Sequence, residues 1–358
     1  MASFLREFNA NAATYVSELE QLHSKNNKEH AFQPSFWLQN EDFTLARDVF
    51  VAATGTIGHE ITKFSLVYSK TPSKEEASSI CQAINKPCEQ LLSATKVALF
   101  CGSGPSLAEE IILGALYVEF LSWWLIVDVI ANPRRVMKSV QELGMTIEKG
   151  ELGRVPELTG RVWESCKVVP NTPKSNCIAS KRSMLQCISV LNDTIKELKE
   201  FLEEQEAEAG ESLNSVEEED DFAFDSTLSE DERALFESGL KLLDMVVAIL
   251  KRGVVTLKNI TIEDAQKDLI AWTATLDRSY KTIQDAIVDM GAALYPPVDV
   301  DELVSALGVV ESAASAGLEC LEAQPSISEV EVQALAKGHA AFDQQVSTVK
   351  TQIEAART

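Results

Sequence analysis

The chain contains 358 residues, of which 45% are apolar and 7% aromatic, and its formal net charge is −23. This length is sufficient for two domains with separate cores. The excess of carboxylates argues against binding to nucleic-acid backbones or to anionic membranes, because both need clustered lysines and arginines.

Apolar residues at three- and four-residue steps predict the first helices. We expect helices over residues 3–24, 43–69 and 73–100. Ser73 and Glu76 form a capping box that marks the start of the third helix. The seam of the second helix consists of Ala46, Phe50, Ala53, Ile57, Ile61, Phe64 and Tyr68.

Residues 111–130 form the most apolar stretch and carry only two charges, Glu119 and Asp128. A transmembrane span and a buried helix both match this composition. Two carboxylates within one span cost several kcal/mol on insertion scales, and no second span is expected elsewhere. We therefore expect this stretch, with Trp123 and Trp124, to be buried in an N-terminal bundle.

Two shorter helices are expected over residues 136–143 and 158–169. A turn at Pro170 and Pro173 then precedes a long helix that starts near residue 174. The seam of this long helix consists of Met184, Ile188, Leu191, Ile195, Leu198 and Leu202. Such spacing is typical of a helix packed inside a bundle.

The segment from Glu203 to Glu232 contains fourteen carboxylates and no lysine or arginine. Like charges at this density repel, so we expect about residues 211–227 to be disordered and the outer carboxylates to continue or cap the flanking helices. The segment acts either as a spacer or as an attractant for a basic partner surface. Ser215 and Ser229 each have a glutamate three residues later, as acidophilic kinases require, although Ser229 also fits a helix cap.

Four helices are expected after the acidic segment. They begin near Ser229, Ile262, Asp299 and Ser326, where capping residues occur. The seam of the first consists of Phe236, Leu240, Leu243, Val247, Leu250, Val254 and Leu257. The last helix carries Val332, Leu335, His339, Phe342, Val346, Val349 and Ile353 on its predicted inner side.

The sequence therefore predicts an all-α fold with two helical bundles. We expect an N-terminal bundle of about five helices at residues 1–208, an acidic linker at 209–228, and a C-terminal bundle of about four helices at 229–358. The two bundles are either autonomous or packed into one continuous core.

No pattern of catalytic, cofactor-binding or metal-ligating residues stands out. The four histidines are scattered, whereas a metal site needs ligands at close spacing. Cys81 and Cys88 share a helix face, as small core residues do. The seven cysteines lack C-x-x-C spacing and no signal peptide is expected at Met1–Phe8, which predicts reduced thiols in a cytosolic or nuclear protein. We expect no enzymatic activity, no cofactor and no metal.

Three short motifs carry a resemblance to a known family. Val162, Trp163, Cys166, Pro170 and Pro173 fit the pattern V-W-x-x-C-x-x-x-P-x-x-P. The other motif residues are Val67, Tyr68, Ser69 and Pro72 at a helix end, and Tyr295, Pro296 and Pro297 in the C-terminal half. In this order, with an acidic interruption between the halves, the motifs resemble the cyclin-D-interacting protein family (GCIP, also called cyclin-D-binding protein).

The resemblance, from about residue 40 to the end, implies a two-bundle fold similar to talin and vinculin modules. It implies a non-enzymatic adaptor that binds D-type cyclins or helix-loop-helix transcription factors and restrains the cell cycle, in nucleus and cytoplasm. The alternative, from analogy of fold alone, is a cytoskeletal or scaffold-type interaction module. The apolar block at Leu116–Val127 departs from the family pattern, as an insertion or a divergent segment. No motif fixes partner contacts, so the motif residues are expected to be structural.

Overall fold

The computed structural model describes residues 2–26, 40–100, 103, 106–107, 133–212, 228–259, 267–324 and 327–356. Over these ranges the chain forms ten α-helices and two short 3-10 helices, without a strand, which confirms the predicted all-α class. The apolar stretch at 111–130 and the acidic residues 213–227 lie outside these ranges. The expectations for both stay predictions.

The chain divides into two compact units, which are described separately. The first comprises Met1–Ala179 and Glu263–Ile270, and the second comprises Ser180–Ile262 and Ala271–Thr358. This division differs from the predicted boundary at residue 208, because it falls at the start of the long helix rather than in the acidic segment.

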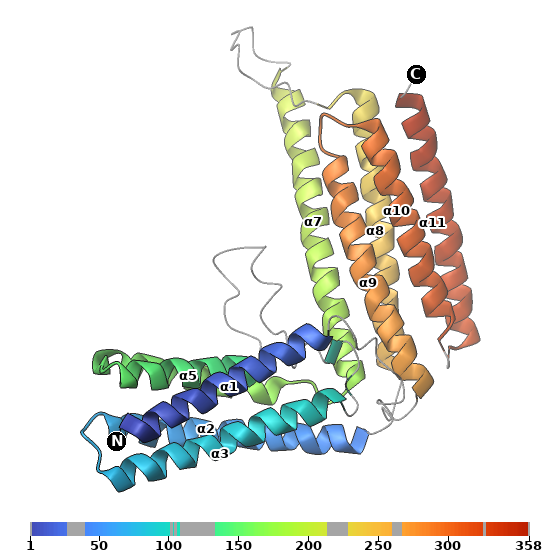
Figure 1. Ribbon diagram of the computed structural model, residues 1–358. Helices are drawn as coiled ribbons and strands as arrows, with labels where there is room; N and C mark the ends of the chain where they lie inside the picture. Colours follow the sequence, from blue (N-terminus) through green and yellow to red (C-terminus); the bar gives the residue numbers. More distant parts are fainter. Residues whose placement is uncertain are drawn as a thin grey trace. The chain divides into compact units, whose positions relative to one another are not determined.

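The first unit is built around the pair α2–α3 (Figure 1). Its helices are α1 (Ala2–Asn26), α2 (Asn40–Tyr68), α3 (Lys74–Phe100), α5 (Pro133–Glu148) and α6 (Val155–Val168). The 3-10 helices η2 (Leu152–Arg154) and η3 (Val169–Asn171) flank α6. α1 packs on α3 and α5, and α6 packs on α2 and α5.

The predicted seam of α2 is buried along its whole length, from Ala46 to Tyr68. Near the end of the seam, the Phe64 ring has its centroid 5.3 Å from that of Phe8 and 4.9 Å from that of Tyr68. The three- and four-residue spacing therefore identifies the core face of this helix correctly.

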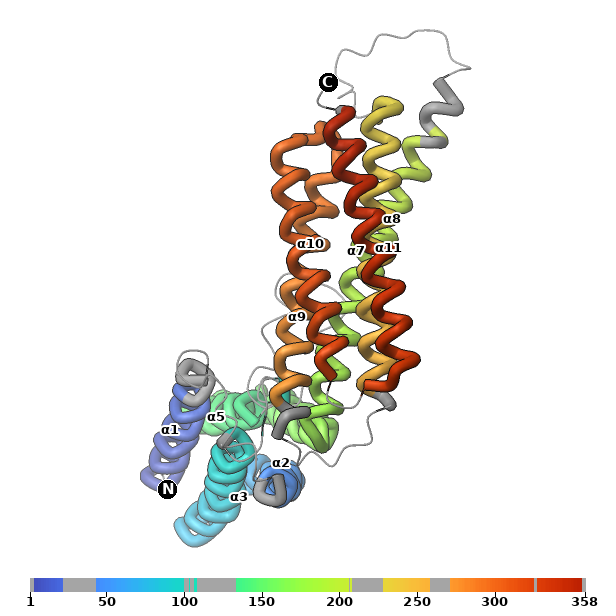
Figure 2. The backbone as a smooth tube through the Cα atoms, turned by 90° about the vertical axis from the view of Figure 1, so that its right-hand side faces the viewer, coloured from blue at the N-terminus to red at the C-terminus, as the bar shows by residue number. Residues whose placement is uncertain are grey.

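The second unit is a bundle of long helices (Figure 2). Its helices are α7 (Asn176–Ser212), α8 (Glu230–Asn259), α9 (Lys267–Ala293), α10 (Val300–Glu322) and α11 (Glu329–Ala356). α8, α10 and α11 lie side by side. All seven residues of the predicted α8 seam are buried, and Leu276, Ile283 and Ile287 of α9 are buried as well.

From Ser180 onward α7 belongs to the second unit rather than to the N-terminal bundle. Phe201 packs on Phe236 of α8 with a centroid distance of 5.5 Å, and Lys199 Nζ lies 2.8 Å from Asp244 Oδ2. The seam spacing shows that α7 packs inside a bundle, but the spacing alone does not specify which bundle. α7 continues to Ser212, so the predicted helical continuation into the acidic segment is confirmed.

Two residues predicted on the inner side of α11, Val332 and His339, are not buried there. Val332 is 39% exposed, and the side chain of His339 is 29% exposed, with Nε2 4.0 Å from Asp343 Oδ1. His339 lies at the edge of the buried seam, where its imidazole reaches the solvent-facing carboxylate. At the start of this helix Ser328 Oγ accepts a hydrogen bond from the Glu331 N–H at 3.3 Å, while Ser326, the predicted cap, lies outside the described residues.

Side-chain caps fix the starts of three other helices as predicted. At α3 the Glu76 N–H donates to Ser73 Oγ at 3.1 Å, and the Ser73 N–H donates to Glu76 Oε2 at 2.8 Å. Ser229 and Glu232 form the same reciprocal box at α8. At α10 the Asp299 carboxylate accepts from two backbone N–H groups.

Removal of the α10 cap is expected to destabilise the second unit by about 1 kcal/mol. Asp299 Oδ1 accepts from the N–H groups of Asp301 at 2.9 Å and Glu302 at 3.1 Å, so Asp299→Ala leaves both donors to water. The measurement is the urea midpoint of unfolding. Asp299→Asn keeps an acceptor oxygen and is expected to lose less than half as much; an equal loss in both variants would show that the charge, not the cap, matters.

Among the residues that the structure describes, one helix is long and apolar enough to span a membrane, namely α10. The sequence predicts no such helix apart from residues 111–130. In α10, half of the most apolar 18-residue stretch is buried inside the protein. Leu303, Leu307, Val310 and Leu318 pack into the second unit. α10 is therefore a core helix of this bundle.

Candidate protein-interaction site

The V-W-x-x-C motif lies on α6 and faces α2. Val162 is fully buried and Cys166 is 8% exposed. Trp163 keeps 41% of its surface exposed, and its Nε1–H donates to the carbonyl of Gly58 at 3.1 Å. The motif thus joins α6 to α2 through the hydrogen bond from Trp163 to Gly58.

The P-x-x-P part of the motif spans η3 and the turn that follows it, and Arg47 of α2 holds this segment in place. Arg47 is only 9% exposed. Its Nη2 donates to the carbonyls of Pro170 and Thr172, each at 2.9 Å, and its Nε donates to Thr172 at 3.1 Å. Pro173 is buried and Pro170 is exposed. A buried guanidinium is retained here because three hydrogen bonds to carbonyls replace those to water.

The motif at the end of α2 lies where α2 packs on α3. Tyr68 is buried, and its hydroxyl lies 3.5 Å from Cys81 Sγ. Burial raises the pKa of Tyr68, and the contact with Cys81 raises it further. Ser69 Oγ donates to the carbonyl of Leu66 at 2.7 Å, Val67 packs against the core, and Pro72 is buried before α3.

The Y-P-P motif lies in the second unit, after α9. Tyr295 packs edge-on against Phe201 and Phe236, with centroids 5.0 and 6.4 Å away. Burial raises the pKa of its phenol, and the neighbouring carboxylates Glu197 and Glu204 raise it further. Pro296 is half-buried, Pro297 is exposed, and the peptide bond between them is cis. The first two motifs thus occupy separate helix contacts of the first unit, and the third belongs to the second unit.

The predicted phosphorylation sites differ in their placement. Ser229 is the first residue before α8, and its Oγ donates to Glu232 Oε2 at 2.7 Å. Ser215 lies outside the residues that the structure describes. Modification of either serine stays a prediction.

Buried thiols in the described part of the chain are poor nucleophiles. Burial raises the pKa of Cys166 and of Cys187 to about 12, and that of Cys320 to about 11. Burial likewise raises the pKa of Cys81 and Cys88. These thiols are protonated at neutral pH. They are poor nucleophiles because the thiolate, not the thiol, is the attacking form. No group of three or more His, Cys, Asp and Glu in this part is placed to hold a metal.

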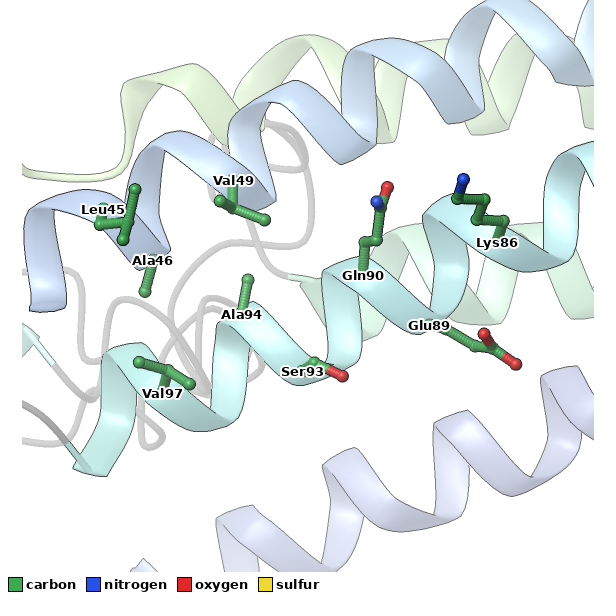
Figure 3. Close-up of a pocket in the computed structure, with 9 residues that line it drawn as sticks. All are labelled: Leu45, Ala46, Val49, Lys86, Glu89, Gln90, Ser93, Ala94 and Val97. Atoms are coloured by element: carbon green, nitrogen blue, oxygen red, sulfur yellow. The ribbon is translucent and has the colours of Figure 1, made fainter.

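A surface groove between α2 and α3 is the best candidate for a functional site (Figure 3). It encloses about 480 Å³. Its lining consists of Leu45, Ala46, Val49, Lys86, Glu89, Gln90, Ser93, Ala94 and Val97. Leu45 is 66%, Val49 39% and Val97 43% exposed, so one end of the groove presents an apolar surface to solvent.

The sequence reading missed this groove. Leu45 and Val49 are four residues apart and lie beside the core seam residues Ala46 and Phe50. They form a second apolar row on α2, outside the face that the core uses. A helix that packs on one side needs one apolar stripe. The second apolar row on α2 is therefore the feature of the sequence that could have indicated the groove.

The comparison with known families bears on the unit that carries the groove. Residues 50–204 match the model of the family described as "Grap2 and cyclin-D-interacting, N-terminal". The resemblance to the cyclin-D-interacting family is confirmed. Two proteins named Cyclin-D1-binding protein 1 are similar to the chain: the one from Bos taurus is 25% identical over 148 residues, and the one from Homo sapiens is 22% identical over 260 residues.

These matches cover 38% and 69% of the chain, and 40% and 67% of the bovine and human proteins, respectively. The names of the family and of both relatives describe binding to another protein. The segment matched to the cyclin-D-interacting family contains all of α3, and therefore the α3 side of the groove, whereas the α2 side at Leu45, Ala46 and Val49 precedes it.

Proposed function

We propose that this chain is a non-enzymatic adaptor that binds a D-type cyclin. The observation that carries the proposal is the family match at residues 50–204, which includes the α3 side of the groove. Exposed apolar residues in a groove between helices are a common way to accept a partner helix. The protonated, buried thiols of this part support a binding role over nucleophilic catalysis.

The proposal includes three finer points taken from the sequence resemblance. The adaptor also binds helix-loop-helix transcription factors, it restrains cell-cycle progression, and it acts in the nucleus and the cytoplasm. The acidic segment from Glu203 to Glu232 supports a basic partner region, since opposite charge speeds encounter.

Isothermal titration of the purified full-length chain with a purified D-type cyclin tests the proposal. We expect saturable binding with a dissociation constant in the micromolar range or tighter, as for partners that bury a standard interface. A cyclin of another class serves as the control. Co-sedimentation with cytoskeletal filaments, without binding to the cyclin, would instead support the scaffold-type alternative.

A further inference from the structure

The groove between α2 and α3 has two chemically different ends. Ala46 and Ala94 form the floor of one end, and Leu45, Val49 and Val97 stand around it. The other end carries Lys86, Gln90 and Ser93. Figure 3 shows Lys86 and Gln90 pointing toward α2, in line with the apolar end.

Lys86 is the charged group that the groove offers to a partner. The other charged lining residue, Glu89, points away from α2 and accepts hydrogen bonds from the Tyr15 hydroxyl at 3.0 Å and the Asn85 amide at 3.1 Å. Lys86 is exposed, and no ion pair joins it to another described residue, whereas Lys63 and Lys96 pair with Glu60 and Glu18. A carboxylate placed over the polar end therefore meets an uncompensated ammonium group.

We infer that this groove binds an amphipathic helix of a protein partner, with apolar residues on Val49 and Val97 and a carboxylate facing Lys86. The inference rests on the proposed function, because it specifies the kind of segment that the adaptor accepts. Apolar anchors supply the binding energy, and the charge contact fixes the direction in which the helix lies.

The dimensions of α3 give the spacing of the partner residues. Val97 and Lys86 are 97 − 86 = 11 residues apart on α3. At a rise of about 1.5 Å per residue this separation is about 16 Å along the helix axis. A partner helix that follows the groove needs two apolar residues one turn apart, and an Asp or Glu about three turns from the first of them.

A fluorescent probe peptide provides the direct test. The peptide is an alanine-rich helix of about eighteen residues with two leucines one turn apart and a glutamate about eleven residues from the first. We expect full-length chain to bind it, Val49→Asp to weaken binding at least tenfold, and Lys86→Glu to weaken it about fivefold, as read by fluorescence anisotropy. A peptide with lysine in place of glutamate is expected to bind Lys86→Glu better than the unaltered chain.

Matched controls lie on the same unit. Leu66→Asp places a charge at an apolar residue of α2 that is 64% exposed and outside the groove, and Lys149→Glu reverses an exposed charge at the end of α5. Both are expected to leave peptide binding unchanged. Because Val49 and Lys86 are exposed, circular dichroism and melting of their variants are expected to match the unaltered chain.

Each outcome separates the groove from the proposed function. A cyclin that binds Val49→Asp and Lys86→Glu as well as the unaltered chain overturns the groove as its site and leaves the adaptor function standing. Peptide binding that obeys the charge swap, without binding of any D-type cyclin, supports the groove and overturns the cyclin proposal. Absence of peptide binding overturns the inference. If the chain dimerises and Val49→Asp abolishes the dimer, a second copy covers the groove and the inference is wrong. If Val49→Asp lowers the melting temperature, the chain itself covers the groove and the inference is likewise wrong.

Discussion

Replacement of Arg47 by methionine is expected to destabilise the first unit by about 3 kcal/mol. The variant keeps the aliphatic part of the side chain but removes three hydrogen bonds to the carbonyls of Pro170 and Thr172. Thr172 is 4% exposed, so its carbonyl is left in a site with little access to water. An acceptor that loses its partner in such a site costs more than the net value of the hydrogen bond.

Hydrogen exchange of peptides that span residues 162–176 is the appropriate measurement, because it reports on this unit without reference to the other. We expect faster exchange around the turn in Arg47→Met. Arg161→Met is the control: its side chain is 53% exposed and its guanidinium pairs with Glu157 at 2.7 Å, so its removal is expected to cost less than about 0.5 kcal/mol. Equal protection in the two variants would contradict a structural role for Arg47.

Arg47 shows where sequence reasoning stops. Seven seam residues of α2 could be predicted, because burial of apolar groups on one helix face produces a visible period. From the sequence alone, an arginine beside that seam is predicted to be exposed to solvent. Only the position of the Pro170 turn, which is 123 residues away in the sequence, makes it a buried donor. The prolines of the motif could be named from the sequence, but Arg47, which holds their turn, could not.

The same limit explains the assignment of α7 and the missed groove. The seam of α7 predicts a bundle helix. Because the dense negative charge after it is typical of a linker, the sequence predicts the domain boundary there. The partners that decide its unit, Phe236 and Asp244, lie beyond the acidic segment. Leu45, Val49 and Val97 likewise become a surface only when α2 and α3 lie antiparallel and bring the start of one helix to the end of the other.

The second large effect is expected at Gly253 of α8, where substitution by alanine is predicted to destabilise the second unit by about 2 kcal/mol. A Cβ at this position would lie 2.3 Å from the Tyr280 hydroxyl oxygen and 2.9 Å from Leu321 Cδ2. Tyr280 is 1% exposed, and its hydroxyl donates to the carbonyl of Leu250. Burial raises the pKa of Tyr280, so the phenol is protonated and can donate at neutral pH.

A matched control and a double variant identify the cause. Alanine is favoured over glycine within helices by about 1 kcal/mol, and Gly308→Ala on the exposed face of α10, with nothing within 4 Å, is expected to show this gain. In a Tyr280→Phe background the hydroxyl is absent, so Gly253→Ala is expected to cost at least 1 kcal/mol less than in the unaltered chain. Hydrogen exchange of peptides from α8 and α9 gives all four free energies of opening. If Gly253→Ala costs the same in both backgrounds, the contact with Leu321 rather than the Tyr280 hydroxyl limits the approach of α8.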